Sequence, residues 1–397
     1  MIGAALYLFP DAIFRLAIMF RHFRKSPKTL AIIRLDHIGD MVLFANTCRS
    51  LVMHCQTNGT PSLIICHPTL IPLVKGWIPD SQVFGLDPKK LWQPRYRYRQ
   101  LWRLQRFQIQ TLFHPVVAHF QYLGSTAAII RCLGCPTTVG YQTKTKGWRR
   151  WFNRISEWHY TWLLPPKLSD MDPLDSRTKQ PHEQYYHEAA LIYFNAEPVN
   201  TPLPTPKCSA NWNFPTDHYI LVAPGASHTM RQWPIGRFIT LLQHLYAENE
   251  TYRFVIIGSK EETAIGEQLR RHTGDYCIDL TGKTSLVETW DLVSRSQCII
   301  TNETGIAQMG AALKKTTFTL TGGGHWGRFV PLPEPSSLTA IHVERSCYNC
   351  NWQCVYSLKK GQTAPCVLDV SVDLVLQTMS QTRLDCPPHS KAIIQAL

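Results

Sequence analysis

The segment LVAPGASHTMRQWPIGRFITLL, residues 221–242, contains the features that decide the fold of the second half of the chain. A short apolar run leads into a turn at Gly225 and Ser227, and an apolar segment with helical spacing begins near Pro234. Strand, tight turn and helix in this order are typical of an α/β unit. The turn amides, the Ser227 hydroxyl and the Arg231 guanidinium together can bind a diphosphate. No Walker motif accompanies them, so this signal is weak by itself.

A similar turn follows the first apolar run, in RLDHIGDMVLFANTCRSL, residues 34–51. Gly39 permits a tight turn, and Asp40 lies at the start of the next predicted helix. Ligands of open α/β sheets bind at this end of the strands, which makes Asp40 a candidate functional carboxylate. The alternative is a helix N-cap whose removal costs ~1 kcal/mol. The spacing favours neither.

A third segment of this kind is QCIITNETGIAQMGAAL, residues 297–313. The predicted strand ends at the tetrapeptide Asn302 to Gly305, and the helix that follows is rich in glycine and alanine. Small side chains let a ligand approach the backbone closely, but they also let a helix pack closely on a sheet. Composition alone does not separate these two roles.

Short apolar runs alternate with longer amphipathic segments along most of the chain. The runs LAIIR, SLIIC and IQTLF precede a proline-rich stretch, and YILVAPG, RFVIIG, QCIIT and TTFTLTGGG follow it. Continuous apolar strands separated by helices predict parallel sheets covered on both faces. The predicted organisation is an amphipathic N-terminal segment (1–29), a first α/β domain (30–200), a proline-rich linker (201–215), a second α/β domain with the cysteine cluster (216–370) and a helical tail (371–397).

Composition limits the class of protein. The chain has 397 residues, 44% hydrophobic and 17% charged, as expected of a packed two-domain protein. A formal charge of +13 favours anionic partners such as phosphates, nucleic acid or an acidic membrane surface. The 13 cysteines are odd in number and no secretory signal opens the chain, which predicts a reducing cytoplasm rather than a disulfide framework.

The first 28 residues, MIGAALYLFPDAIFRLAIMFRHFRKSPK, are apolar but interrupted by Asp11 and Arg15. The apolar runs are shorter than the ~20 residues that span a bilayer. Apolar positions at helical spacing, followed by basic residues, predict an amphipathic helix. Such a helix can lie on an anionic membrane surface or pack against its own domain, and both possibilities remain open.

Five segments in a fixed order resemble glycosyltransferase family 9, the family of ADP-heptose:lipopolysaccharide heptosyltransferases. They are R-x3-I-G-D, PGAS-x3-R-x-WP, I-I-G-x3-E, DLTGKTSL and the NETG-to-AAL segment, spread over about 280 residues. The resemblance implies a GT-B fold, in which two Rossmann-like lobes with parallel sheets face a central cleft. It also implies an acceptor on the first lobe, a nucleotide sugar on the second, and an inverting transfer.

The resemblance assigns roles to individual residues. Asp40 stands at the position of the catalytic base, and Ser227 and Arg231, in the Gly225 turn, stand where the family holds the donor diphosphate. Glu261 lies within one residue of the ribose-binding acid. The tripeptide Glu303, Thr304 and Gly305 matches the D-[TS]-G donor loop, with glutamate replacing aspartate.

Four cysteines near the C-terminal end have the spacing C-x2-C-x3-C-x11-C: Cys347, Cys350, Cys354 and Cys366. Thiolates presented by two tight turns predict a tetrahedral sulfur site, for which structural zinc is the general expectation. The cluster also resembles that of the autotransporter heptosyltransferases, which implies iron. Zinc, iron and simple loop thiols are the three alternatives.

The expected function is transfer of heptose from ADP-heptose to a lipopolysaccharide core or related glycolipid, in the cytoplasm at the inner face of the membrane. No catalytic metal is expected, because Arg231 supplies positive charge to the leaving group. Arginines alternate with aromatic residues in residues 94–107 and 144–154, which favours a phosphorylated glycolipid acceptor. Alternatives are another nucleotide sugar, a protein acceptor, or a metal-bearing nucleic-acid-binding protein; under the favoured reading no nucleic acid is bound.

Overall fold

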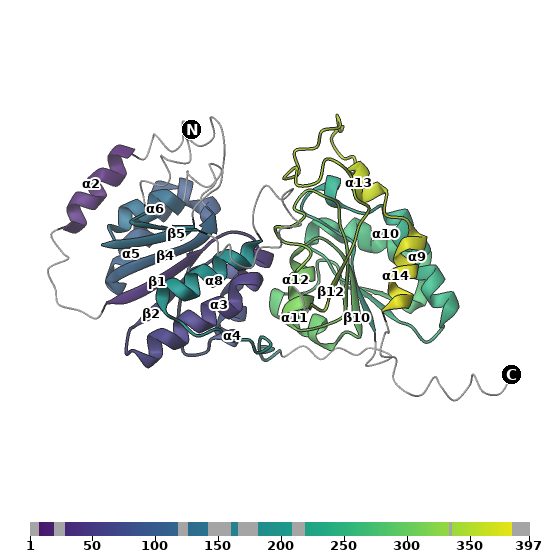
Figure 1. Cartoon of the computed structure of the whole chain (residues 1–397), viewed down its shortest axis with the longest axis horizontal. Coiled ribbons are helices and arrows are strands. Elements are labelled where there is room, and N and C mark those ends of the chain that lie inside the picture. The colour runs from purple at the N-terminus through teal and green to yellow at the C-terminus, as the bar shows by residue number, and fades with distance from the viewer. Residues whose placement is uncertain are drawn as a thin grey trace. The chain divides into compact units, whose positions relative to one another are not determined.

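The computed structural model of the protein describes residues 8–19, 28–117, 126–141, 160–165, 182–208, 219–332 and 336–382. The chain divides into two compact units, Met1–Lys207 and Cys208–Leu397. Each unit contains a six-stranded parallel sheet with helices on both faces (Figure 1). The prediction of an α/β chain with two parallel sheets is confirmed.

The first sheet has the strand order β3-β2-β1-β4-β5-β6. Every residue of the central strand β1 is buried, because strands flank it and helices cover both faces. This burial explains the uninterrupted apolar run that identified β1 in the sequence. The strands are β1 (Thr29–Arg34), β2 (Ser62–Cys66), β3 (Gln82–Gly85), β4 (Ile109–Val117), β5 (Thr137–Tyr141) and β6 (Trp162–Leu164).

Helices cover this sheet from two sides (Figure 1). On one side α3 (Ile38–Thr57) packs against α8 (Glu183–Phe194) and α4 (Ile71–Trp77). On the other, α6 (Thr126–Leu133) packs against α5 (Pro94–Leu104) and α2 (Leu8–Met19). The long helix α3 therefore carries Asp40 in its first turn, directly after the central strand.

The N-terminal helix α2 packs on its own unit and also keeps an exposed apolar face. Its Asp11, 2% exposed, accepts hydrogen bonds from Arg97 Nε at 3.0 Å and from Tyr98 Oη at 3.0 Å. Ile13 and Leu16 on the same helix are 52% and 59% exposed. No helix within the described ranges is long and apolar enough to cross a membrane. Residues 1–7 and 20–27 of the predicted amphipathic segment lie outside the described residues.

The second sheet repeats the order of the first, as β12-β11-β10-β7-β8-β9. Its strands are β7 (Ile220–Ala223), β8 (Phe254–Ile256), β9 (Cys277–Asp279), β10 (Cys298–Asn302), β11 (Thr317–Leu320) and β12 (Leu338–Ile341). Helices α9 (Ile235–Glu248), α10 (Thr263–Thr273) and α14 (Val372–Gln381) lie on one side, and α11 (Leu286–Arg295) and α12 (Gly305–Ala312) on the other (Figure 1). The short α13 (Pro365–Leu368) precedes α14.

The proline-rich stretch begins as part of the first unit. A Cβ placed on Gly76 of α4 would come within 2.4 Å of the Pro206 ring, so glycine is needed for this close packing. Just upstream, the backbone N–H of Val199 donates to Ser50 Oγ at 2.8 Å. Residues 209–215 of the predicted linker and 383–397 of the predicted tail lie outside the described residues.

Three histidines in the described part of the first unit are buried. His114 on β4 hydrogen-bonds to Tyr160 Oη at 2.6 Å, and His187 on α8 packs against Phe44 and Tyr141. Burial, together with a smaller contribution from the charge of nearby Arg34, lowers the pKa of His114 and of His187 to about 3. Burial likewise lowers the pKa of the third, His182, to about 4. These imidazoles are neutral in the folded protein at physiological pH.

We expect the first unit to lose stability as the pH falls below ~6.5, the ordinary histidine pKa. The unfolded chain then binds protons that the folded unit cannot, and each such histidine costs ~1.4 kcal/mol per pH unit. Hydrogen exchange of β1 and β4 peptides at pH 7.5 and 5.5 measures the loss. His114→Gln should reduce the pH dependence, whereas His272→Gln, an exposed control on α10, should not. Equal pH dependence in all three proteins would contradict the assignment.

Candidate active site

Asp40 lies in the first turn of α3, at the carboxyl end of the first sheet. One of its carboxylate oxygens, Oδ2, accepts a hydrogen bond from the His37 backbone N–H at 3.2 Å and closes a capping box. His37 is the N-cap residue, so the N-cap role considered for Asp40 is wrong in position: Asp40 closes the capping box from the third residue of the helix. Oδ1 has no hydrogen-bond partner among the residues that the structure describes, and the side chain is half-buried. Capping the helix leaves this second oxygen available for chemistry.

A buried arginine supports the loop that leads to Asp40. Arg34, at the end of β1, donates from Nε to Asp36 Oδ1 at 3.0 Å and from Nη1 to His187 Nε2 at 3.4 Å. Burial raises the pKa of Asp36 to about 7; Arg34 opposes the shift and Asp40 adds to it. Sequence reasoning missed this pair, although an arginine ending an otherwise apolar buried strand was a visible signal.

In the second unit, the turn after β7 packs against the side chain of Glu262, which follows β8. A Cβ on Gly225 would lie 1.7 Å from Glu262 Oε1, so the turn requires glycine. Glu262 Oε2 also accepts the Ser259 backbone N–H at 2.7 Å. Glu261, which the resemblance placed near the ribose-binding acid, is exposed. The carboxylate against the turn is therefore that of the neighbouring residue.

Asn302, at the end of β10, holds this turn to the start of α9. It is fully buried. Its Nδ2 donates to the carbonyls of Pro224 at 2.6 Å and Gly225 at 3.2 Å, and its Oδ1 accepts the Trp233 N–H at 3.0 Å. The sequence did not assign a role to Asn302, because its hydrogen-bond partners lie in the segment after β7, far from it in the chain.

Arg231 meets the NETG segment at the carboxyl end of the sheet. Its Nη2 donates to Glu303 Oε1 at 3.1 Å and to the Glu303 carbonyl at 2.7 Å, and Nη1 lies 3.4 Å from Ser227 Oγ. Arg231 Nε is buried and has no hydrogen-bond partner among the described residues. The guanidinium is thus anchored at two nitrogens, through Nη2 to Glu303 and through Nη1 to Ser227, and Nε is left as a donor without a partner among the described residues.

Glu303 is buried and fully engaged. Oε1 also accepts from His325 Nδ1 at 3.1 Å, and Oε2 accepts from the Thr321 hydroxyl at 2.8 Å. Burial would raise the pKa of Glu303, but the His325 hydrogen bond and the Arg231 charge outweigh it and hold that pKa below its ordinary value. Glu303 is therefore a carboxylate at neutral pH.

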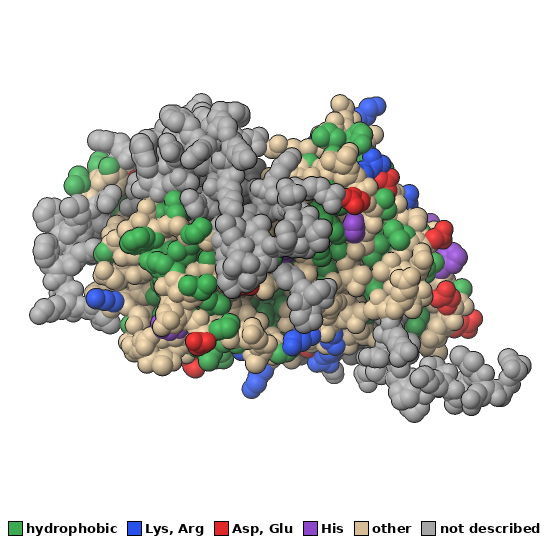
Figure 2. Space-filling model, viewed as in Figure 1, with side chains coloured by type: hydrophobic (Ala, Val, Ile, Leu, Met, Phe, Trp, Pro, Cys, Tyr) green, Lys and Arg blue, Asp and Glu red, His purple; other side chains and the backbone are tan. Residues whose placement is uncertain are grey.

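Thr304 and Gly305 form the N-terminus of α12 beside Glu303. The Thr304 hydroxyl accepts the Ile306 backbone N–H at 3.3 Å and caps the helix, which begins at Gly305. Gln308, one turn further along α12, donates to the Phe329 carbonyl at 3.3 Å. Charged side chains of both signs are interspersed on the face of the second unit that Figure 2 shows.

The predicted cysteine ligands lie together. Cys347, Cys350, Cys354 and Cys366 are free thiols that line one small pocket with Trp352 and Tyr356. Burial raises the pKa of Cys350 and of Cys366. In the described ranges, however, no group of three or more histidine, cysteine or acidic side chains has the arrangement of a metal site.

The cysteine loop, residues 347–366, packs directly on the glycines that follow β11. The N–H groups of Asn349 and Asn351 donate to the carbonyls of Gly323 at 2.7 Å and Gly324 at 2.8 Å. A Cβ on Gly324 would lie 2.3 Å from the Trp352 ring, and the Arg231 guanidinium carbon lies 5.4 Å from the centroid of that ring. The loop therefore forms one wall around Arg231.

Comparisons with known proteins agree with this architecture. Lipooligosaccharide heptosyltransferase 2 of Haemophilus influenzae is 28% identical over 104 residues, which are 25% of this chain and 30% of that relative. The chain thus matches about 30% of the length of such curated relatives. The structure of Escherichia coli ADP-heptose lipopolysaccharide heptosyltransferase II superposes with a TM-score of 0.60 at 16% identity, covering 89% of this chain and 98% of the other.

A third protein of the same fold is TibC of enterotoxigenic E. coli, described as an iron-containing dodecameric glycosyltransferase. It superposes with a TM-score of 0.52 at 14% identity, covering 90% of this chain and 76% of TibC. The model of glycosyltransferase family 9 (heptosyltransferase) matches residues 116–359, more than half of the chain. The fold is that of these GT-B enzymes, and the chain belongs to glycosyltransferase family 9.

Proposed function

We propose that this family 9 enzyme transfers heptose from ADP-heptose, with inversion, to a lipopolysaccharide core or a related glycolipid. The observation that carries the proposal is the Arg231 cluster, in which a half-buried arginine is fixed by Glu303 and its Nε has no partner among the described residues. An oriented guanidinium beside a helix N-terminus suits a diphosphate leaving group. Another nucleotide sugar or a protein acceptor is the alternative within the same class.

On the acceptor side, Asp40 takes the proton of the attacking hydroxyl through Oδ1. The acceptor oxygen forms a bond to the anomeric carbon as the bond from that carbon to the diphosphate breaks, and ADP leaves with the electron pair. The capping bond to His37 fixes the carboxylate, so little reorganisation precedes proton transfer. Arg231 and the α12 N-terminus stabilise the negative charge that develops on the diphosphate.

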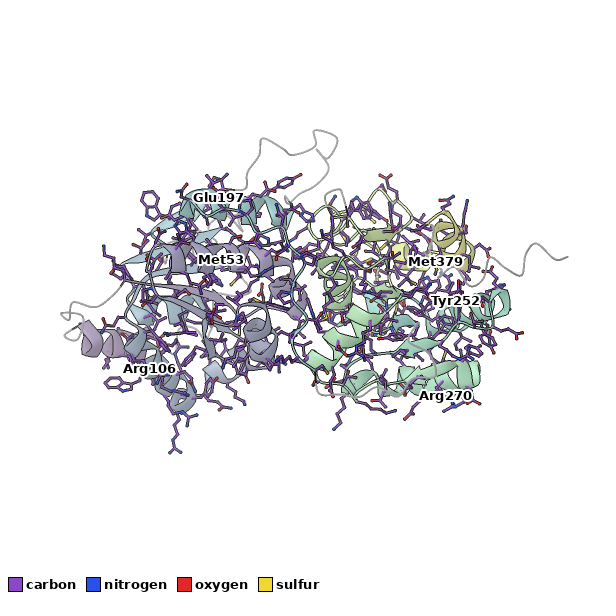
Figure 3. The ribbon with its side chains drawn as sticks, turned by 90° about the horizontal axis from the view of Figure 1, so that it is seen from below. Met53, Arg106, Glu197, Tyr252, Arg270 and Met379 are labelled. Atoms are coloured by element: carbon purple, nitrogen blue, oxygen red, sulfur yellow. The ribbon has the colours of Figure 1, made fainter. Side chains whose placement is uncertain are left out.

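The acceptor that we propose is a phosphorylated glycolipid at the cytoplasmic membrane surface. Helix α5 presents exposed arginines and the 48%-exposed Trp102, and Arg106 follows on the outside of the first unit (Figure 3). Ile13 and Leu16 on α2 add exposed apolar surface to the same unit. Basic and aromatic side chains beside apolar ones favour peripheral contact with anionic lipid. The second basic segment, residues 144–154, lies outside the described residues.

We also propose that Cys347, Cys350, Cys354 and Cys366 hold one structural zinc or iron ion. A set of four thiols facing one pocket fits the preference of both metals for sulfur ligands. Bound there, the ion supplies cross-links that order the cysteine loop. The loop residues then hold Trp352 against Arg231, so their contribution to transfer is indirect.

The test of function is mass spectrometry of products after incubation with lipooligosaccharide acceptors and a panel of nucleotide sugars. ADP-heptose should add one heptose. Asp40→Asn should lower single-turnover rates by ~10²–10⁴-fold, because an amide cannot accept the proton, while ADP binding is retained. Asp80→Asn, an exposed carboxylate of the same unit, is the control and should be fully active. Wild-type rates in Asp40→Asn would make Asp40 a cap only.

Arg231→Ala should weaken ADP binding by ~10²-fold and slow transfer as well, because charged hydrogen bonds of ~1.5–3 kcal/mol are lost. Calorimetry measures the dissociation constant of ADP. Arg231→Lys should recover part of the loss, since it restores the charge but not the planar donors. Arg270→Ala, a change on the outer side of α10 (Figure 3), should leave the affinity unchanged. An ADP affinity that Arg231→Ala does not alter would remove Arg231 from the donor site.

Protein purified without added metal should contain close to one zinc or iron ion per chain by elemental analysis. Cys350→Ser should reduce this content sharply and lower the melting temperature, because metal binding and loop order are coupled. Cys208→Ser, a half-buried cysteine outside the loop, should retain both properties. Metal-free wild-type protein that melts at the same temperature with and without added metal would refute the site.

A further inference from the structure

His325, in the loop after β11, is a histidine of the donor site to which the sequence analysis assigned no role. Its Nδ1 lies 3.1 Å from Glu303 Oε1, and its side chain is 18% exposed. Its ring packs edge-on against Phe329, with centroids 5.2 Å apart, and against Trp352, with centroids 6.0 Å apart. These contacts fix the orientation of the imidazole beside Arg231.

The hydrogen bond to Glu303 determines which ring nitrogen carries a proton. Glu303 is ionised, because hydrogen bonds and charge hold its pKa below the ordinary value, so its oxygens can only accept. Nδ1 of His325 must therefore carry the hydrogen and donate it. The structure gives the other nitrogen, Nε2, no hydrogen-bond partner among the described residues.

The charges of Arg231 and Glu303 indicate what Nε2 of His325 could contribute. Arg231 contributes one positive charge to the site, but Glu303, at 3.1 Å, cancels it formally. A diphosphate would thus meet an ion pair with no net charge. Of the other groups near His325, Thr321 is neutral, the Arg328 guanidinium carbon lies 4.5 Å from the centroid of the Phe329 ring, and Trp352 lines the pocket of the four thiols. Protonation of His325 would restore one positive charge where the leaving group needs it.

We propose that His325 is a catalytic residue that takes up a proton from solvent when the nucleotide binds and donates a hydrogen bond from Nε2 to the diphosphate. Imidazole is the side chain whose charge changes near neutral pH, so the bound anion can draw it into the protonated form. The reaction proton remains with Asp40, and the balance of the transfer step is unchanged. This inference rests on the proposed function, because it assigns the ligand of Nε2 as the diphosphate of the donor.

Calorimetry of ADP binding in buffers of different ionisation enthalpy measures the protons taken up. On binding ADP near pH 7.5, the wild-type protein should take up more protons than His325→Gln, and the difference should be a substantial fraction of one proton per site. Its ADP affinity should fall by up to ~10-fold per pH unit above neutrality. In His325→Gln this dependence should be much flatter, although glutamine can still donate to Glu303. His272→Gln, exposed on α10, should behave as wild type.

The outcomes separate the two proposals. If ADP does not bind at all, the proposed function fails together with this inference. If ADP binds and His325→Gln shows the same proton uptake and pH dependence as wild type, only the role of His325 is overturned. Should His325→Gln fail to fold, nitrogen NMR of the histidine rings in wild-type protein decides the matter. Added ADP should protonate Nε2 of His325, and an unchanged protonation state of the ring would refute the inference.

Discussion

The ion pair between Arg231 and Glu303 is the interaction on which the candidate donor site depends. A buried carboxylate is costly unless it is paired and hydrogen-bonded, and Glu303 meets this condition through Arg231, His325 and Thr321. Each of these groups is in turn fixed in place by the carboxylate. Removing Glu303 would leave the half-buried Arg231 guanidinium without its ion-pair partner.

Glutamate at position 303 differs from the aspartate of the family pattern by one methylene. In this structure both of its oxygens are occupied by side chains of the protein itself. The added length lets the carboxylate reach the Arg231 side chain while its own carbonyl also accepts from that guanidinium. These contacts favour a role for Glu303 in holding Arg231.

The sequence predicted the central strands and the motif residues but not the groups between them. Strand β1 was visible because burial on both faces demands a continuous apolar run, whereas the short edge strands β3 and β9 carry polar residues and gave no such signal. Asp40 and Arg231 stand in ordered motifs. The sequence located the ribose-binding acid only to within one residue of Glu261, and the backbone path shows that the Glu262 side chain is the one that reaches the Gly225 turn. His325 acquires its role from contacts across the fold.

The backbone of the cysteine loop adopts conformations that are unfavourable by themselves. Asn349, Asn351 and Trp352 have φ values of 64°, 50° and 57°, a left-handed region that is unfavourable for tryptophan above all. Such conformations persist only where the surroundings over-determine them. Hydrogen bonds to Gly323 and Gly324 supply part of this constraint, and cross-linking of the four thiols would supply the remainder. Because Trp352 lies against both Arg231 and His325, the contacts that hold this strained loop in place also set the environment of these two side chains.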